Sequence, residues 1–215
     1  MEDFDAATVI ERLRAKAKSA EEVEQFEAAE QIDETKRIDQ VLQAFGVPRR
    51  IRMTLTAPVE TSALARVREW LAKGEASWCI VLSSDKGVGK STAAGWWLSR
   101  VADGVMPDAR MFRRWWPSAE IASMDFYGDD FKRLCECESL VIDDLGVEFN
   151  DAKGAFQSKL DRLLDSRYRE FRRTIITTNL TAKGFSERYD GRIFDRLREG
   201  AQWQSVAGAS LRRTG

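Results

Sequence analysis

The chain of 215 residues has no histidine, three cysteines and four prolines. Without histidine, no general base in this protein can be an imidazole. The cysteines at 79, 135 and 137 cannot form a disulfide framework, and with no histidine to complete a set they argue against a structural zinc site. The sequence also lacks an apolar run of about 18 residues and an N-terminal signal, so we expect a soluble, cytoplasmic protein with no membrane partner.

The net charge of −1 hides an uneven distribution of charge. Residues 1–45 contain twelve acidic and six basic side chains, whereas the remainder has an excess of basic ones. Two regions of opposite charge indicate different partners for each. We therefore divide the chain into an acidic N-terminal arm, residues 1–45, and a body, residues 46–215, whose length suits one domain.

A phosphate-binding loop follows the apolar run 78–82. Its core is Gly87-Val-Gly-Lys-Ser-Thr92, with Ser84 where the usual pattern has its first glycine. Glycine allows phosphate oxygens to approach the backbone, and a helix N-terminus after the loop favours negative charge. Lys90 is expected to reach the β- and γ-phosphates of ATP, and Ser91 to bind Mg²⁺. The predicted nucleotide-binding residues are Ser84, Asp85, Lys86, Gly87, Val88, Gly89, Lys90, Ser91 and Thr92.

A second apolar run, 139–142, ends in Asp143 and Asp144. Alone, this pattern equally fits a buried strand with a polar end. About fifty residues after a phosphate loop, it predicts that Asp143 holds Mg²⁺, mostly through water. Asp144 occupies the position where many ATPases have the glutamate that polarises the attacking water, and it is one methylene shorter.

Alternating strand and helix patterns predict an α/β fold with a parallel sheet covered by helices on both faces. Helical spacing of apolar residues predicts a helix over 6–45, broken at Gly46–Arg50. This helix is either a solvated arm or a docking element for a partner. The body is expected to have strands at 78–82, 109–116, 140–143, 174–178 and 203–206, and helices at 63–73, 91–101, within 118–134, at 155–171 and at 187–198.

The chain resembles the AAA+ ATPases of the DnaC-type helicase loaders and the IstB-type transposition helpers. The resemblance covers residues 46–215 and implies a three-layer P-loop sandwich without a separate helical lid. Its motifs are the phosphate loop, Leu140-Val-Ile-Asp-Asp-Leu-Gly146, Leu164-Asp-Ser-Arg-Tyr168, Thr174-Ile-Ile-Thr-Thr-Asn-Leu180 and Arg192-Ile-Phe-Asp-Arg-Leu-Arg198, with Gly46-Val-Pro-Arg-Arg-Ile-Arg52 ahead of them.

The resemblance also implies roles for single residues. Asn179 matches the sensor that positions the attacking water; otherwise it only caps a turn. Arg196 matches the arginine finger that reaches the ATP of a neighbouring subunit, and Arg192, one turn earlier, is the alternative. A purely structural Arg196 would pair with Asp195 or Glu199. Arg212 resembles a second sensor.

The function implied by the resemblance is a magnesium-dependent ATPase acting in DNA replication initiation. It would self-associate, bind single-stranded DNA and dock a replicative helicase through the arm. Two alternatives stay open, namely a transposition helper that delivers a transposase and a scaffold that binds ATP with little turnover. Paired tryptophans beside arginines suit either core packing or DNA stacking, and packing is the stronger reading for Trp96, Trp97, Trp115 and Trp116.

Overall fold

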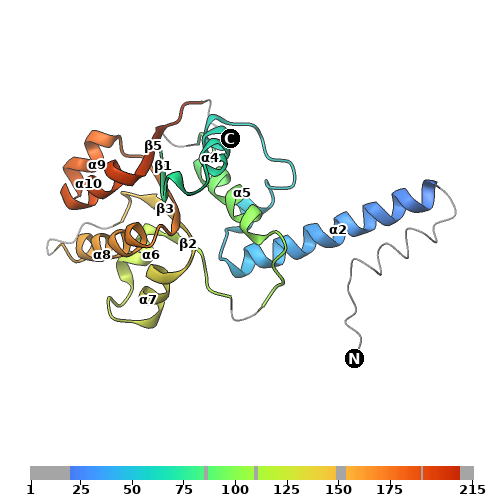
Figure 1. Ribbon diagram of the computed structural model, residues 1–215, viewed down its shortest axis with the longest axis horizontal. Helices are drawn as coiled ribbons and strands as arrows, with labels where there is room; N and C mark the ends of the chain where they lie inside the picture. The colour runs from blue at the N-terminus through green and yellow to red at the C-terminus, as the bar shows by residue number, and fades with distance from the viewer. Residues whose placement is uncertain (1–19, 85–86, 109–110, 149–153, 190, 209–215) are drawn as a thin grey trace.

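The computed structural model describes residues 20–84, 87–108, 111–148, 154–189 and 191–208, with only the backbone of residues 20–30, 32 and 75. A long helix, α2, leads into an alternation of strands and helices (Figure 1). The strands are β1 (Cys79–Ser83), β2 (Trp115–Pro117), β3 (Ser139–Leu145), β4 (Arg173–Thr178) and β5 (Ala201–Ser205). The helices are α2 (Ala20–Ala44), α3 (Arg49–Arg52), α4 (Ser62–Ala72), the 3-10 turn η1 (Gly74–Ala76), α5 (Lys90–Ala102), α6 (Ser118–Ser123), α7 (Asp129–Glu136), α8 (Ala155–Arg169), α9 (Ala182–Arg188) and α10 (Gly191–Gly200).

The five strands form one sheet in the order β2-β3-β4-β1-β5, and every neighbouring pair is parallel. Side chains of β1 alternate between two hydrophobic cores, as the pleat of a strand requires. Ile80 and Leu82 face a core shared with α2, α4 and α5. Val81 faces a second core shared with α7, α8, α9 and α10. The predicted parallel sheet with helices on both faces is confirmed.

Helix α2 packs on the body through its C-terminal part. Val41, Leu42 and Phe45 are almost fully buried in the first core. Gly46 ends the helix with a φ of 80°, and the Val47 N–H donates to the Leu42 carbonyl at 3.0 Å, which is a Schellman motif. The other end of α2 projects away from the body (Figure 1). The body core therefore begins before residue 46, and the part of the predicted helix before residue 20 lies outside the described residues.

Two predicted elements differ from the structure. The strand expected at 109–116 is a short edge strand, β2, which begins only at Trp115 and includes Pro117. At its start, the N–H groups of Arg114 and Trp115 both donate to the Phe45 carbonyl instead of to a strand. Proline is tolerated in β2 because an edge strand leaves one side unpaired.

The single helix expected at 187–198 is two helices, α9 and α10. They are separated at Tyr189, whose extended backbone ends α9. The Tyr189 ring is buried against Phe185, with ring centroids 4.5 Å apart, and its hydroxyl donates to Glu148. Burial of this ring accounts for the break. Among the described residues, no helix is long and apolar enough to cross a membrane.

Candidate nucleotide-binding site

A cleft of about 600 Å³ opens where β1, β3 and β4 end. Parallel strands direct their carboxyl ends to one edge of the sheet, which is where ligands of such folds bind. The phosphate loop, the end of β3 and the residue after β4 line one side of the cleft, and the segment around α3 lines the other. The lining residues are Pro48, Arg50, Ile51, Thr54, Val59, Gly87, Val88, Gly89, Lys90, Ser91, Thr92, Asp143, Asp144, Val147 and Asn179.

The described part of the phosphate loop has the geometry that phosphate binding needs. Gly87 and Gly89 have φ angles of 95° and 90°, a left-handed conformation that glycine adopts without strain. Gly89 precedes the first residue of α5, so the N-terminus of that helix opens into the cleft. Lys90 is buried, and its ammonium donates to the Ser84 carbonyl at 2.8 Å and to Asn179 Oδ1 at 3.1 Å.

Ser91 and Asp143 meet at the base of the cleft. The Ser91 hydroxyl donates to Asp143 Oδ1 at 2.9 Å, and the Thr177 hydroxyl donates to the same oxygen at 2.6 Å. Burial raises the pKa of Asp143, the Asp144 charge adds to the rise, and the two hydroxyl donors partly offset it. The Ser91 hydroxyl and the Asp143 carboxylate form a set of oxygen ligands that fits Mg²⁺. This ion prefers oxygen ligands and keeps several of its waters.

Asp144 has a φ of 54°, which is uncommon for any residue other than glycine. Its backbone is held on both sides, because its N–H donates to Thr177 Oγ1 at 2.9 Å and its carbonyl accepts from the Ser118 hydroxyl at 2.9 Å. The Asp144 side chain is exposed and lines the cleft. This position suits a carboxylate that polarises water.

Asn179 directly follows β4, and its amide oxygen contacts the Lys90 ammonium. The structure thus brings together Ser84, Lys90, Ser91, Asp143 and Asn179, with Asp144 on the same cleft. The predicted residues Asp85, Lys86 and Arg212 lie outside the described residues. Thr177 and Ser118 were missed by the sequence reasoning, although the two threonines before Asn179 were visible as polar residues ending a strand.

Arg196 lies on α10, outside the cleft. Its guanidinium is bound by two carboxylates of α8, with Nε at 3.0 Å from Asp165 Oδ1 and Nη1 on Asp161. The alternative partners expected from sequence, Asp195 and Glu199, are wrong. Asp195 lies 3.8 Å from Arg198, and Glu199 accepts from the Tyr168 hydroxyl. Arg192 is on the same helix and exposed.

The paired tryptophans differ in solvent exposure: one of each pair is buried and the other is partly exposed. Trp97 and Trp115 are buried, so Trp115 cannot stack on DNA. Trp116 is half-buried, and the Arg113 guanidinium lies 4.3 Å from its ring centroid. Trp96 is also half-buried, with the Arg68 guanidinium 5.1 Å from its ring. Core packing is confirmed for Trp97 and Trp115, and DNA contact stays a prediction for Trp116.

The structure is an α/β fold with a parallel sheet, a phosphate loop after β1 and an acidic end of β3, and solved structures of replication proteins have a similar fold. The DnaC helicase loader has a TM-score of 0.59 and 18% identity, covering 74% of this chain and 100% of that one. DnaI has a TM-score of 0.55 and 15% identity, covering 74% and 94%. DnaA bound to AMPPCP and single-stranded DNA has a TM-score of 0.57 and 15% identity, covering 76% of this chain and 51% of DnaA.

The sequence matches no protein-family model and no curated protein. The likeness to known proteins therefore rests on the fold. In that fold, the chain is structurally similar to replication helicase loaders and to the replication initiator DnaA.

Proposed function

We propose that this protein is a magnesium-dependent ATPase that acts as a helicase loader in DNA replication initiation. The observation that carries the proposal is that two hydrogen-bonded pairs, Lys90 with Asn179 and Ser91 with Asp143, line the same cleft. Structural similarity to a helicase loader over the whole of its solved chain supports the biological role.

Each residue of the cleft has a physical reason for its part. Lys90 neutralises the β- and γ-phosphates by exchanging its contacts with Ser84 and Asn179 for phosphate oxygens. Ser91 and Asp143 would hold Mg²⁺, which would neutralise charge on the phosphates. Asp144 orients the attacking water and accepts its proton, and Asn179 fixes that water from the β4 side.

The base of ATP has a place on the other wall of the cleft. Pro48, Ile51 and Val59 line that wall, so the side of the cleft opposite the phosphate loop is partly apolar. Apolar side chains favour the face of a purine ring, as in most small-molecule sites. The Gly46–Arg52 motif thereby gains a role that its sequence alone did not reveal.

The proposed partners follow from the opposite charges of the acidic arm and the basic body. Helix α2 projects from the body and is acidic in sequence, which suits docking of a replicative helicase. Single-stranded DNA is the second proposed partner, and ATP-dependent self-association is the third. The finger, Arg196 or Arg192, acts on the ATP of a neighbouring subunit, since α10 lies outside the chain's own cleft.

Two assays test this function against its alternatives. A turnover assay with and without single-stranded DNA separates a working ATPase from a scaffold, because a scaffold binds ATP with negligible hydrolysis in both conditions. A binding assay with purified replicative helicase and purified transposase separates the loader from a transposition helper. The expected result is DNA-responsive hydrolysis and helicase binding that is lost when residues 1–30 are removed. Binding to the transposase alone would contradict the loader role.

A further inference from the structure

The turn after β3 has an unusual backbone for a segment so close to the candidate active site. Asp144 and Gly146 both have positive φ angles, 54° and 107°. The Val147 N–H closes the turn by donating to the Asp144 carbonyl at 3.3 Å. A left-handed aspartate costs about 1–2 kcal/mol, so it persists only where its surroundings impose it.

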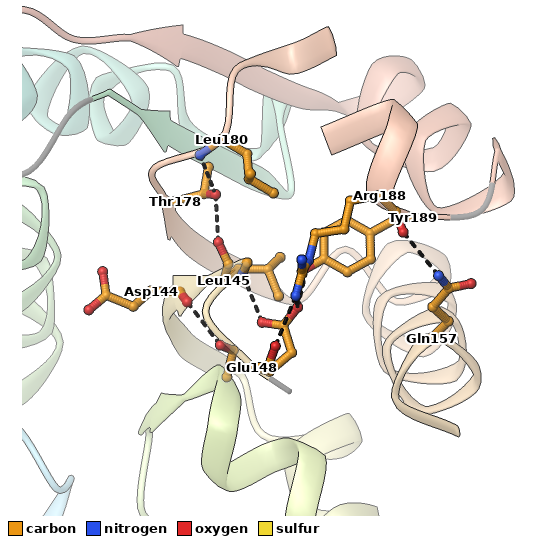
Figure 2. Close-up of polar contacts among 10 residues, drawn as sticks. Asp144, Leu145, Glu148, Gln157, Thr178, Leu180, Arg188 and Tyr189 are labelled. Carbon is orange, nitrogen blue, oxygen red and sulfur yellow. Dashed lines mark hydrogen bonds and ion pairs between the residues drawn. The ribbon is translucent and has the colours of Figure 1, made fainter. Parts of the chain in front are cut away.

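One side of this turn is tied to the neighbouring strand β4. The Thr178 hydroxyl donates to the Leu145 carbonyl at 2.6 Å, and the Leu180 N–H donates to the same hydroxyl at 3.0 Å (Figure 2). Leu180 also packs directly on Gly146, where a Cβ would lie 2.8 Å from Leu180 Cδ1. These contacts fix the position of the turn over the end of the sheet.

The other side is tied to the end of α9 by Glu148. Its side chain is only 1% exposed. Oε2 accepts from the Gly146 N–H at 2.8 Å, and Oε1 accepts from Arg188 Nε at 3.2 Å and from the Tyr189 hydroxyl. Gln157 supports this end by donating to the Arg188 carbonyl at 3.0 Å. Figure 2 shows Arg188 and Tyr189 converging on Glu148.

Glu148 itself is not placed to react with a nucleotide. It does not line the cleft, and Figure 2 shows the Asp144 carboxylate pointing away from it. Burial opposes ionisation, but the hydrogen bonds from Tyr189 and the Gly146 N–H outweigh it, and the pKa of Glu148 lies below its ordinary value. A buried, ionised and fully engaged carboxylate outside the cleft has a holding role rather than a chemical one.

We propose that Glu148 is a positioning residue for ATP hydrolysis, which clamps the Asp144 turn to α9 through Gly146, Arg188 and Tyr189. The inference rests on the proposed function. Aspartate is one methylene shorter than the usual glutamate, so the reach of its carboxylate depends more directly on where its backbone lies. The clamp and the strained φ together direct the short side chain into the cleft.

The first test is Glu148→Gln in the full chain, which keeps the side-chain size and removes the charge. Misplacement of a catalytic group by about 1 Å costs up to ~100-fold in rate, so we expect kcat to fall at least ~10-fold. The Kd for ATP should stay within about twofold, because the described hydrogen bonds of Lys90 and Ser91 go to Ser84, Asn179 and Asp143 and not to the clamp. Ser77→Ala is the matched control, since it removes buried hydrogen bonds at the opposite end of β1.

The second test places Glu148→Gln in an Asp144→Asn background under single-turnover conditions. If Glu148 acts through Asp144, the second substitution causes no further loss of rate. A purely structural defect would lower the residual rate by the same factor as in the wild type, and that result would overturn the proposal. A wild-type kcat retained in Glu148→Gln would overturn it as well.

Amide hydrogen exchange measures the effect of the clamp on the turn in the absence of nucleotide. The Gly146 amide should exchange at least ~10-fold faster in Glu148→Gln, whereas the amides of β1 should not change. Unchanged exchange at Gly146 would show that no clamp exists. A wild-type protein that binds ATP without hydrolysing it would instead sink the proposed ATPase function, so the two failures are distinguishable.

Discussion

The phosphate loop and the α8–α10 face each hold a cation predicted to act on the γ-phosphate, but they hold it differently. Among the described residues, Lys90 donates to uncharged acceptors, which are the Ser84 carbonyl and hydroxyl and the Asn179 amide oxygen. Arg196 is bound by the carboxylates of Asp161 and Asp165. Both cations make charge-assisted hydrogen bonds, but only the carboxylates around Arg196 add the attraction of a full opposite charge.

The two cations differ in the contacts that each must lose in order to reach ATP. Lys90 exchanges neutral acceptors for charged phosphate oxygens within its own cleft, so binding improves its contacts. Arg196 must leave two carboxylates before it can reach a neighbouring subunit. Under the proposed function, we therefore expect ATP binding to need one chain only, and hydrolysis to need an assembly that releases or redirects Arg196.

The largest expected effect is on hydrolysis, from Arg196→Ala. A trans arginine contributes about 10³-fold or more to the rate, so kcat should fall by about that factor. ATP affinity should be nearly unchanged, because Arg196 lies outside the cleft of its own chain. Steady-state turnover and ATP titration measure the two quantities.

Arg192→Ala is the paired control for that experiment. If Arg192→Ala shows the defect and Arg196→Ala does not, Arg192 is the finger. Arg196 would then be a structural link between α10 and α8, and the contrast between the two cations would lose its functional meaning.

The next effect is on binding, from Lys90→Ala. Removing the charged partner of a buried phosphate costs about 2–5 kcal/mol, which is roughly 30-fold or more in Kd. The fold should be retained, because water in the cleft can replace the Lys90 ammonium as the hydrogen-bond donor to its acceptors. Isothermal titration with ATP and a thermal unfolding scan check both points, and an unchanged ATP affinity would refute the role of Lys90.

A smaller effect is expected from Asp161→Asn, which weakens the hold on Arg196. Half-buried and exposed ion pairs contribute about 0.2–1 kcal/mol, so kcat of the assembled protein should rise by a factor between about 1.4 and 5. Asp195→Asn is the matched control, because Asp195 pairs with Arg198 on the same helix. A fall in kcat for Asp161→Asn would mean that the carboxylates present Arg196 to the neighbour rather than retain it.

The smallest effect concerns Asp143 and pH. Because the folded-state pKa of Asp143 is raised by burial, the folded protein holds this proton to a higher pH than the unfolded chain does. Stability of the nucleotide-free protein therefore falls as pH rises from the ordinary carboxyl pKa through the raised value. Asp143→Asn should have a higher Tm than wild type at neutral pH, and the difference should vanish below the ordinary carboxyl pKa. An equal Tm of the two proteins at every pH would contradict a raised pKa of Asp143.

The nucleotide motifs could be predicted from sequence because each is a local pattern whose geometry is set by its own strand and turn. Lys90, Ser91 and Asp143 thus lie where expected. The clamp of Glu148 with Arg188 could not be predicted, since its two residues are forty positions apart and meet only through packing. Arg167 is similar: it lies within a motif, but its role is to donate to Thr174 Oγ1 and the Cys137 carbonyl from full burial.

The boundary of the arm also could not be predicted from local sequence. Its helical spacing correctly predicted α2 from residue 20 onward. Charge alone placed a boundary at residue 45, although Val41, Leu42 and Phe45 contribute to the body core. The change of charge near residue 45 describes the surface of the protein. The start of the hydrophobic core is seen only from which side chains pack together.

The most direct test of a site shared between subunits is a mixing experiment. Lys90→Ala subunits keep Arg196 but cannot bind ATP tightly, and Arg196→Ala subunits bind ATP but lack the finger. Each variant alone should be nearly inactive. When they are mixed under conditions that assemble the wild type, hydrolysis should recover to a measurable fraction of wild-type activity, because one subunit supplies the finger and the other the intact loop. Mixtures that assemble and stay inactive would contradict the account.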